Sequence, residues 1–173
     1  MLDEVEFESA TNYGNNFKKA GNAGSTYTTV LAASKQIIAG ANEIIGEVRD
    51  SKIGAPATGA DVNYIESPHA YNSIQDFYDN IMSCKHALYG GATIDGNTPS
   101  ATSLIGVCLQ IVQTKAAAEN VEAKLEAALA AIDNMKRPFV LYYTDQSAKD
   151  AMTALDGLEE ALNKLDAALD AYE

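Results

Sequence analysis

Polar side chains that can bind a ligand are concentrated between positions 52 and 83 of the 173-residue chain. A helical pattern ends near Asp50 and another begins at Asn72 or Ser73. The loop of about 20 residues between them is of a length that is usually functional or disordered in compact domains. The loop and the next helix supply Lys52, Glu66, Ser67, His69, Asn72, Ser73, Asp76, Asn80 and Ser83. We predict that these residues form a ligand-binding surface or a contact with another domain.

Carboxylates one helical turn apart are the first candidates for binding a cation. Glu43 and Glu47 are four positions apart on a predicted helix, and Asp76 lies four positions before Asn80. Each pair therefore projects from one helix face. Without histidine, such oxygen ligands suit a hard cation such as calcium. The alternative is an ordinary solvated helix face, and the metal stays unknown at this point.

The two histidines, His69 and His86, differ in their setting. His69 follows Glu66 and Ser67 in the loop, where it can bind a metal, orient a proton donor or simply hydrogen-bond to the fold. His86 falls late in a predicted helix, where a cation complements the helix dipole. The predicted helices lack the Glu-x-x-His pairs that metal-carboxylate bundles place on facing helices.

Motifs for nucleophilic catalysis and nucleotide binding are absent. Ser67 and Ser73 lie near His69, but no nucleophile-elbow or oxyanion signature accompanies them. Cys84 falls on an apolar helix face, which is the wrong setting for a reactive thiolate. Phosphate-binding patterns such as G-x-x-x-x-G-K and G-x-G-x-x-G do not occur. We therefore assign no catalytic residue to this chain.

The elements that position these residues are predicted from apolar residues at helical spacing. Helices are expected over residues 25–50, 73–89, 100–135 and 146–172, and no long segment alternates as a strand does. Gln113-Thr114-Lys115 interrupts the pattern of 100–135, which fits either one bent helix or two consecutive helices. These elements predict an all-α, antiparallel four-helix bundle with a long loop between the first two main helices.

Apolar stripes predict which side of each helix faces the core. Residues 25–50 carry a wide apolar stripe that is typical of a helix facing a core. Val30, Ile37 and Ile44 fall at intervals of seven, joined by Ala41 and Val48 and flanked by Leu31, Ile38 and Ile45. The other stripes are Ile74, Phe77, Ile81, Cys84 and Leu88; Leu104, Val107, Cys108, Ile111 and Val112; Val121, Leu125, Ala128, Ile132 and Met135; and Ala151, Leu155, Leu158, Leu162, Leu165 and Leu169. The last stripe alternates spacings of four and three, which is a heptad seam.

Length, charge and cysteine content restrict the class of protein. One bundle domain is expected over residues 24–173, after an irregular or short helical segment at 1–23, with a helix near 3–20. The formal charge is -12, from 24 acidic and 12 basic residues, which disfavours nucleic acid as a partner. No apolar run approaches the ~20 residues of a membrane span. Cys84 and Cys108 are expected to be buried, and a disulfide between them stays open.

Several sequence blocks resemble those of a known family. EVRDSKIGAP, IESPHAYNSIQDFYDNI and ALYGG follow one another between positions 47 and 91, and SLIGVCLQIV and Arg137-Pro138-Phe139 come later. In this order they resemble the imelysin-like family, also called the M75 peptidase family. The resemblance implies an all-helical bacterial protein of the cell envelope that is linked to iron uptake. Family members have two helical-bundle halves, and this chain resembles only the second.

The resemblance also implies a division of roles between the halves. The motif GxHxxE, which marks the family's metal site, belongs to the first half and is absent here. We therefore expect a non-catalytic binding or scaffold module. Part of a metal-dependent peptidase, or a helical adaptor with no small ligand, are the alternatives.

Cofactor, partner and location follow from the same resemblance. Iron or another divalent metal is the implied cofactor, and the implied partner is the first helical half or another envelope protein. A periplasmic or cell-surface location is implied as well. Met1-Leu2-Asp3-Glu4 lacks the basic start and apolar core of a signal peptide, so we expect a mature fragment or a piece without its export signal.

Overall fold

A computed structural model describes residues 13–91 and 98–171 of the chain. Its elements are α2 (Tyr13–Lys18), α3 (Val30–Gly46), the π-helical segment η1 (Glu47–Gly54), α4 (Ala55–Thr58), α5 (Ser73–Tyr89), α6 (Leu104–Cys108), α7 (Val112–Asp133), α8 (Phe139–Tyr142) and α9 (Gln146–Asp170). No strand occurs within these two ranges. The prediction of an all-α fold is therefore confirmed.

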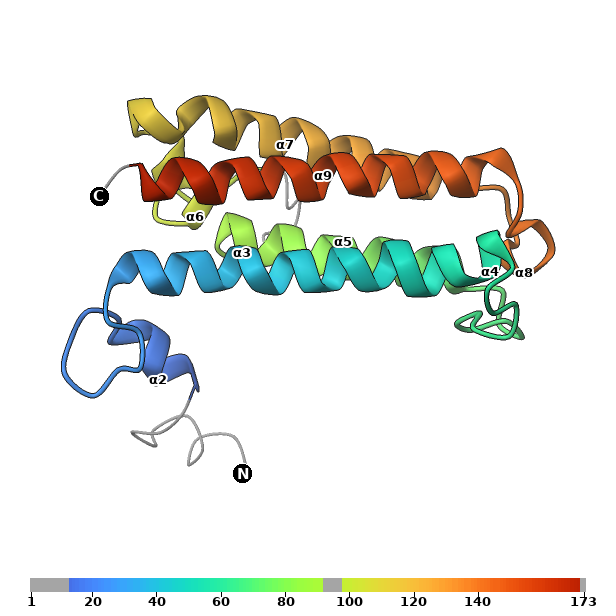
Figure 1. The fold of residues 1–173 in the computed structure, drawn as a ribbon, viewed down its shortest axis with the longest axis horizontal. Helices are drawn as coiled ribbons and strands as arrows, with labels where there is room; N and C mark the ends of the chain where they lie inside the picture. Colours follow the sequence, from blue (N-terminus) through green and yellow to red (C-terminus); the bar gives the residue numbers. More distant parts are fainter. Residues whose placement is uncertain (1–12, 92–97, 172–173) are drawn as a thin grey trace.

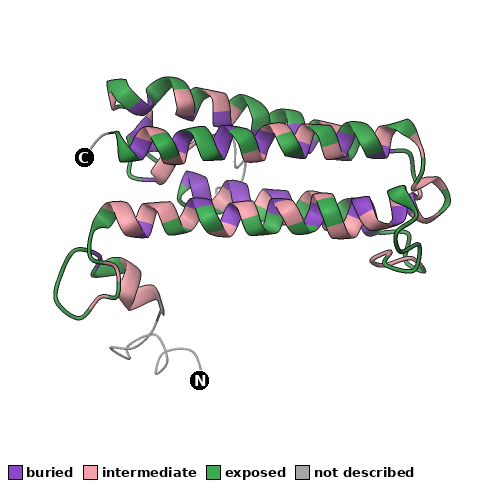
Figure 2. Cartoon of the chain, in the orientation of Figure 1, coloured by how far each residue is buried: buried purple, intermediate pink, exposed green. Residues whose placement is uncertain are grey.

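The long helices α3, α5, α7 and α9 lie side by side, and each runs opposite to the one before it (Figure 1). α3 packs on α5 and α9, and α7 packs on the same two helices. Figure 2 shows buried residues on the sides of these helices that face one another. The short helix α2 lies beside the first turns of α3 (Figure 1). It falls inside the predicted helix near 3–20, whose first residues lie outside the described ranges.

The predicted core faces of α5, α7 and α9 are confirmed. Every residue of the three corresponding stripes is buried, and Phe77, Leu125, Leu155 and Leu162 are fully enclosed. α5 also has the predicted bounds of 73 and 89, and Gly90 ends it in the left-handed conformation with φ of 85°. The spacing of apolar residues therefore predicts the buried faces of these helices correctly, and the residues at the ends of α5 predict its bounds correctly.

The core face of α3 agrees with the prediction in part. The buried residues on it are Ala33, Ile38, Ala41 and Ile45. By contrast, Val30 is 68% exposed and Ile44 is 37% exposed, so the series at intervals of seven lies at the outer edge of a wide apolar surface. A helix with apolar residues on both sides of its core contact gives two stripes of equal quality, and the spacing alone does not rank them.

The region from 100 to 135 forms two consecutive helices and not one bent helix; the sequence had left both arrangements open. The break falls at residues 109–111, just before the predicted interruption. Thr114 is buried there, and its Oγ1 donates to the carbonyl oxygen of Cys108 at 2.8 Å. The predicted stripe on the first of these helices is partly wrong, because Val112 is 88% exposed and Val107 is exposed, whereas Ile105 is buried. The break resets the phase of the helix, which a single stripe cannot follow.

The helix that was expected to end near Asp50 continues to Thr58. Backbone hydrogen bonds in η1 change to the wider π pattern, and α4 follows without a turn. Gly54 suits this path, because a Cβ there would lie 2.6 Å from the carbonyl oxygen of Arg49. Gly54 and Pro56 indicate a helix end by their type, which explains the wrong boundary. The connection to α5 therefore spans residues 59–72.

Candidate functional site

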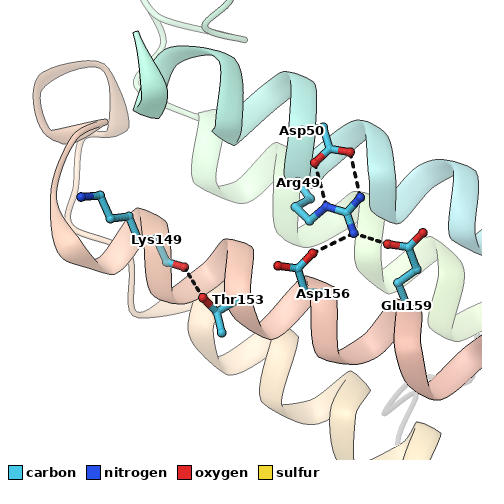
Figure 3. A network of polar contacts seen from close by, with 6 residues as sticks. All are labelled: Arg49, Asp50, Lys149, Thr153, Asp156 and Glu159. Atoms are coloured by element: carbon cyan, nitrogen blue, oxygen red, sulfur yellow. Dashed lines mark hydrogen bonds and ion pairs between the residues drawn. The ribbon is translucent and has the colours of Figure 1, made fainter. Parts of the chain in front are cut away.

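Arg49 fixes the π-helical segment against α9 (Figure 3). Its Nε lies 2.7 Å from Asp50 Oδ1, and its Nη1 lies 3.0 Å from Asp156 Oδ1 and also contacts Glu159. The guanidinium holds the pKa of the Asp50 carboxyl below its usual value through their hydrogen bonds. Because Asp156 and Glu159 belong to α9, these ion pairs set how η1 is oriented on the bundle.

Two side-chain contacts hold the following loop against η1. Lys52 Nζ lies 2.9 Å from Glu66 Oε2, so the buried carboxylate oxygen is neutralised by an ammonium. The hydroxyl of Tyr64 donates to Glu47 Oε1 at 3.2 Å. The negative charge of Glu47 and this hydrogen bond raise the pKa of Tyr64. The loop therefore folds back over the π-helical segment instead of extending away from it.

Two hollows open on either side of Lys52, and we call them together the Lys52 site. The first has a volume of about 290 Å³ and is lined by Lys52, Asn63, Tyr64, Ile65 and Glu66. The second has a volume of about 220 Å³ and is lined by Glu43, Ile44, Glu47, Val48, Lys52 and Asn80. One ammonium thus faces three carboxylates, and the site as a whole favours a positively charged group.

The structure brings together part of the predicted surface. Lys52, Glu66 and Asn80 line the Lys52 site. Ser73 is buried at the start of α5, where its hydroxyl donates to the carbonyl oxygen of Glu66. It therefore joins the loop to the helix and does not face a ligand. Ser67 has a positive φ of 51°, which places it at a turn of the loop.

The remaining predicted residues lie elsewhere. Asn72 occupies the N-cap position of α5 without the expected capping hydrogen bond; its amide donates to Asp76 Oδ1 at 2.8 Å instead. The Ser83 hydroxyl donates to the carbonyl oxygen of Asn80 at 2.6 Å. His69 is exposed and lines neither hollow of the Lys52 site. The structure therefore separates the loop histidine from the charged groups around Lys52.

Sequence reasoning missed Arg49 and Tyr64. Arg49 carries no motif of its own, because its contact with Glu159 on α9 spans 110 positions and depends on the fold. Tyr64 carries no pattern of its own, because its contact with Glu47 spans 17 positions and depends on the path of the loop. Only the fold shows that the predicted carboxylate pair Glu43 and Glu47 lies beside Lys52.

The metal that the sequence suggests does not fit the described residues alone. Within residues 13–91 and 98–171, no three His, Cys, Asp or Glu side chains converge so that they could hold an ion. Glu43 and Glu47 line the same hollow, but they supply only two carboxylates and Lys52 stands beside them. A cation at this position would need oxygen ligands besides these two carboxylates.

Neither cysteine is suited to nucleophilic chemistry. Cys84 and Cys108 are buried and form no disulfide. Burial raises the pKa of the Cys84 thiol to about 11, and burial also raises the pKa of Cys108. Both side chains are therefore neutral core groups, as their positions on apolar helix faces predict.

The fold and its site define a class of all-α bundle proteins. The family model described as Imelysin, peptidase M75, matches residues 2–169. The chain therefore belongs to the imelysin family. None of the described helices is long and apolar enough to cross a bilayer.

Two solved structures share this fold. An imelysin peptidase from Bacteroides ovatus is 26% identical, with a TM-score of 0.78, and the match covers 90% of this chain and 45% of that chain. A protein described as an iron-regulated protein A precursor from Parabacteroides distasonis is 23% identical, with a TM-score of 0.79, and the match covers 91% and 47%. The chain thus spans about half the length of each. No curated protein matches it significantly.

Proposed function

We propose that this chain is a non-catalytic binding or scaffold module of an imelysin-type cell-envelope protein that takes part in iron or haem uptake. The Lys52 site is its functional surface, either as a ligand cleft or as the contact with a first helical half. The module acts in the periplasm or at the bacterial cell surface. Residues 24–173 form the helical binding domain, after an irregular or short helical N-terminal segment at residues 1–23.

One observation carries this proposal. The Lys52 site is an open, charged depression that lies next to apolar residues of α3 that the bundle does not cover. A charged depression beside an uncovered apolar surface is typical of a site that another molecule completes. The chain also spans 45% and 47% of the two solved structures that share its fold, which supports a first half as that molecule.

Two features support a non-catalytic role. The GxHxxE motif is absent from the sequence. A zinc peptidase site needs three protein ligands and a polarised water, and the described residues bring no such set together. Iron therefore reaches this module with ligands from a partner, while Lys52, Glu66 and Asn80 position the partner or the ligand.

A double substitution tests the proposal. We expect Glu43→Ala with Asn80→Ala, two residues that line the Lys52 site, to leave the melting temperature unchanged, because Glu43 is exposed and Asn80 is only half-buried. The same variant should weaken the binding of iron or haem, or association with a purified first half. Metal content and binding are measured with and without the added first half. His86→Ala with Asn120→Ala, on other helix faces, is the matched control.

Two outcomes would contradict the proposal. If the melting temperature falls sharply while binding by the folded protein is unchanged, the region is only structural and the chain is an adaptor with no small ligand. The other outcome concerns the peptidase alternative, which the structural likeness to an imelysin peptidase favours. Zinc-stimulated cleavage of a general peptide substrate by this chain, lost in His69→Ala, would establish that alternative.

A further inference from the structure

A third hollow extends the Lys52 site along the bundle. It has a volume of about 270 Å³ and is lined by Phe17, Gln36, Ile37, Gly40, Ala41, Ile44, Ser83, Cys84 and Ala87. It shares Ile44 with the second hollow, which in turn shares Lys52 with the first. Neighbouring hollows thus meet at a shared lining residue in a row along α3 and η1, and we call this row the α3–α5 groove. From Gly40 to Lys52 it is about 18 Å long, at the rise of a helix.

One end of the groove is apolar. Ile37 and Ile44 belong to the stripe that was expected in the core, and the structure places them along this groove instead. Ile44 is 37% exposed. No atom lies within 4 Å of the position that a Cβ would take on Gly40. The space beside Gly40 is therefore unfilled, and a bulky apolar side chain of another molecule can occupy it.

The middle of the groove is negatively charged. Glu43 and Glu47 line the second hollow, and the ammonium of Lys52 beside them is already paired with Glu66. The negative charge of Glu47 also raises the pKa of Tyr64 at the neighbouring hollow, which agrees with an excess of negative charge there. A group that enters between Glu43 and Glu47 should therefore be cationic.

We propose that the α3–α5 groove binds a helix of a partner protein, with an apolar side chain beside Gly40 and a Lys or Arg between Glu43 and Glu47. This inference rests on the proposed function and names the chemistry of the partner. Gly40 and Glu47 are seven positions apart, or about 10.5 Å along α3. The apolar and basic residues of the partner are accordingly about seven positions apart on one helix face.

The length of the groove distinguishes a helix from a small molecule. An organic cation would occupy only the second hollow, and its binding would not depend on the space beside Gly40. An amphipathic helix fills the apolar end and the acidic middle together, as in other helix-in-groove complexes. Binding should therefore depend on both ends of the groove, and the charged contact should weaken as salt rises.

Gly40→Leu is the decisive variant, and Gly46→Leu is its matched control. A Cβ at either position meets no atom within 4 Å, and both replacements remove a helix-weakening glycine from the same helix. Both variants should therefore fold. Only Gly40 lines the groove, so only Gly40→Leu fills it.

The probe is a designed helical peptide of about 20 residues. It carries a Leu for the apolar end of the groove and, seven positions away on the same helix face, an Arg for the acidic middle. Its binding to the whole chain is measured by fluorescence anisotropy. We expect Gly40→Leu, and Glu43→Gln with Glu47→Gln, each to weaken binding at least about tenfold. Gly46→Leu should leave it within about twofold, and a peptide with Glu in place of Arg should not bind.

Four results would overturn the inference. One is that the wild-type chain does not bind the peptide. Another is that Gly40→Leu and Gly46→Leu change binding equally. A third is that agmatine binds as tightly as the peptide and is insensitive to Gly40→Leu, which would indicate a small-cation site. Finally, if a purified first half binds and Gly40→Leu does not weaken it, this inference fails while the proposed function stands.

Discussion

The two sides of the bundle differ in how completely their apolar residues are covered. Where α7 meets α9, the seam of Leu155, Leu158, Leu162 and Leu165 is fully buried. On the α3–α5 side, Val30 and Ile44 remain exposed and three hollows follow one another. Apolar residues at similar spacing are thus buried on one side and partly exposed on the other. One set stabilises the fold, and the other leaves a surface on which a partner can be recognised.

The contacts between α3 and α9 show how the open side is kept in place. Lys35 Nζ lies 3.2 Å from Asp166 and 2.5 Å from Asp170, both on α9. Arg49 makes the corresponding contacts further along, to Asp156 and Glu159. Ion pairs near both ends of this helical segment thus join it to α9. They lie on the side that faces α9, so they do not cover the face toward the groove.

The largest expected effect is a difference in stability loss when the same number of apolar atoms is removed from each side. We expect Leu162→Ala to lower the free energy of unfolding by about 2–5 kcal/mol, because it opens a cavity in a closed seam. Ile44→Ala should lower it by less than about 1 kcal/mol, since that side chain is partly in solvent. Chemical denaturation of both variants measures the difference. Equal losses would show that the α3–α5 side is packed as tightly as the seam.

A smaller effect is expected from replacing Gly54 or Gly46 with Ala, the same substitution on the adjoining elements η1 and α3. A Cβ on Gly54 would lie 2.6 Å from the carbonyl oxygen of Arg49, so Gly54→Ala should cost about 1–3 kcal/mol through strain. Gly46 has open space around that position, so Gly46→Ala should stabilise the helix by roughly 0.5–1 kcal/mol. Thermal unfolding distinguishes the two signs. Stabilisation by both variants would mean that the π-helical segment relaxes to an α-helix.

The smallest effect concerns the floor of the groove. Burial raises the pKa of Cys84 to about 11, above the value of about 8.5 for a free thiol. The neutral thiol therefore stabilises the fold below about pH 8.5, and this contribution is lost as pH rises through 11. We expect no alkylation of the native protein by iodoacetamide at pH 8, and rapid alkylation in denaturant. Fast native labelling of Cys84 but not of Cys108 would show that water reaches the groove floor.

The sequence predicts the closed side of the molecule well and the open side poorly. Leu155, Leu158 and Leu162 are buried as expected because a core face needs only one period. On α3, the predicted wide stripe contains the buried Ile38, Ala41 and Ile45 and also the exposed Val30 and Ile44. Periodicity records that a side chain is apolar and does not record which surface covers it.

The candidate site was predicted in position but not in composition. Lys52, Glu66 and Asn80 meet at the Lys52 site, whereas His69 lies apart from it. Tyr64 and Glu47 meet only because the loop turns back over η1. Such contacts depend on loop geometry, which no local spacing encodes. The expected loop length was also too great, because the helical path continues past Asp50 through Gly54 and Pro56, two residue types that usually end a helix.

The π-helical segment also makes the site adjustable by insertion or deletion. A π turn encloses one residue more than an α turn, so η1 can be regarded as a helix that has absorbed an extra residue. Removing one residue within Glu47–Gly54 would let the backbone return to α geometry. The residues after the deletion would then keep roughly their direction relative to α3, because the π turn had already taken up the extra residue. A one-codon change within η1 could thus alter the side chains of the Lys52 site, while the leucine seam on the far side of the bundle keeps its register.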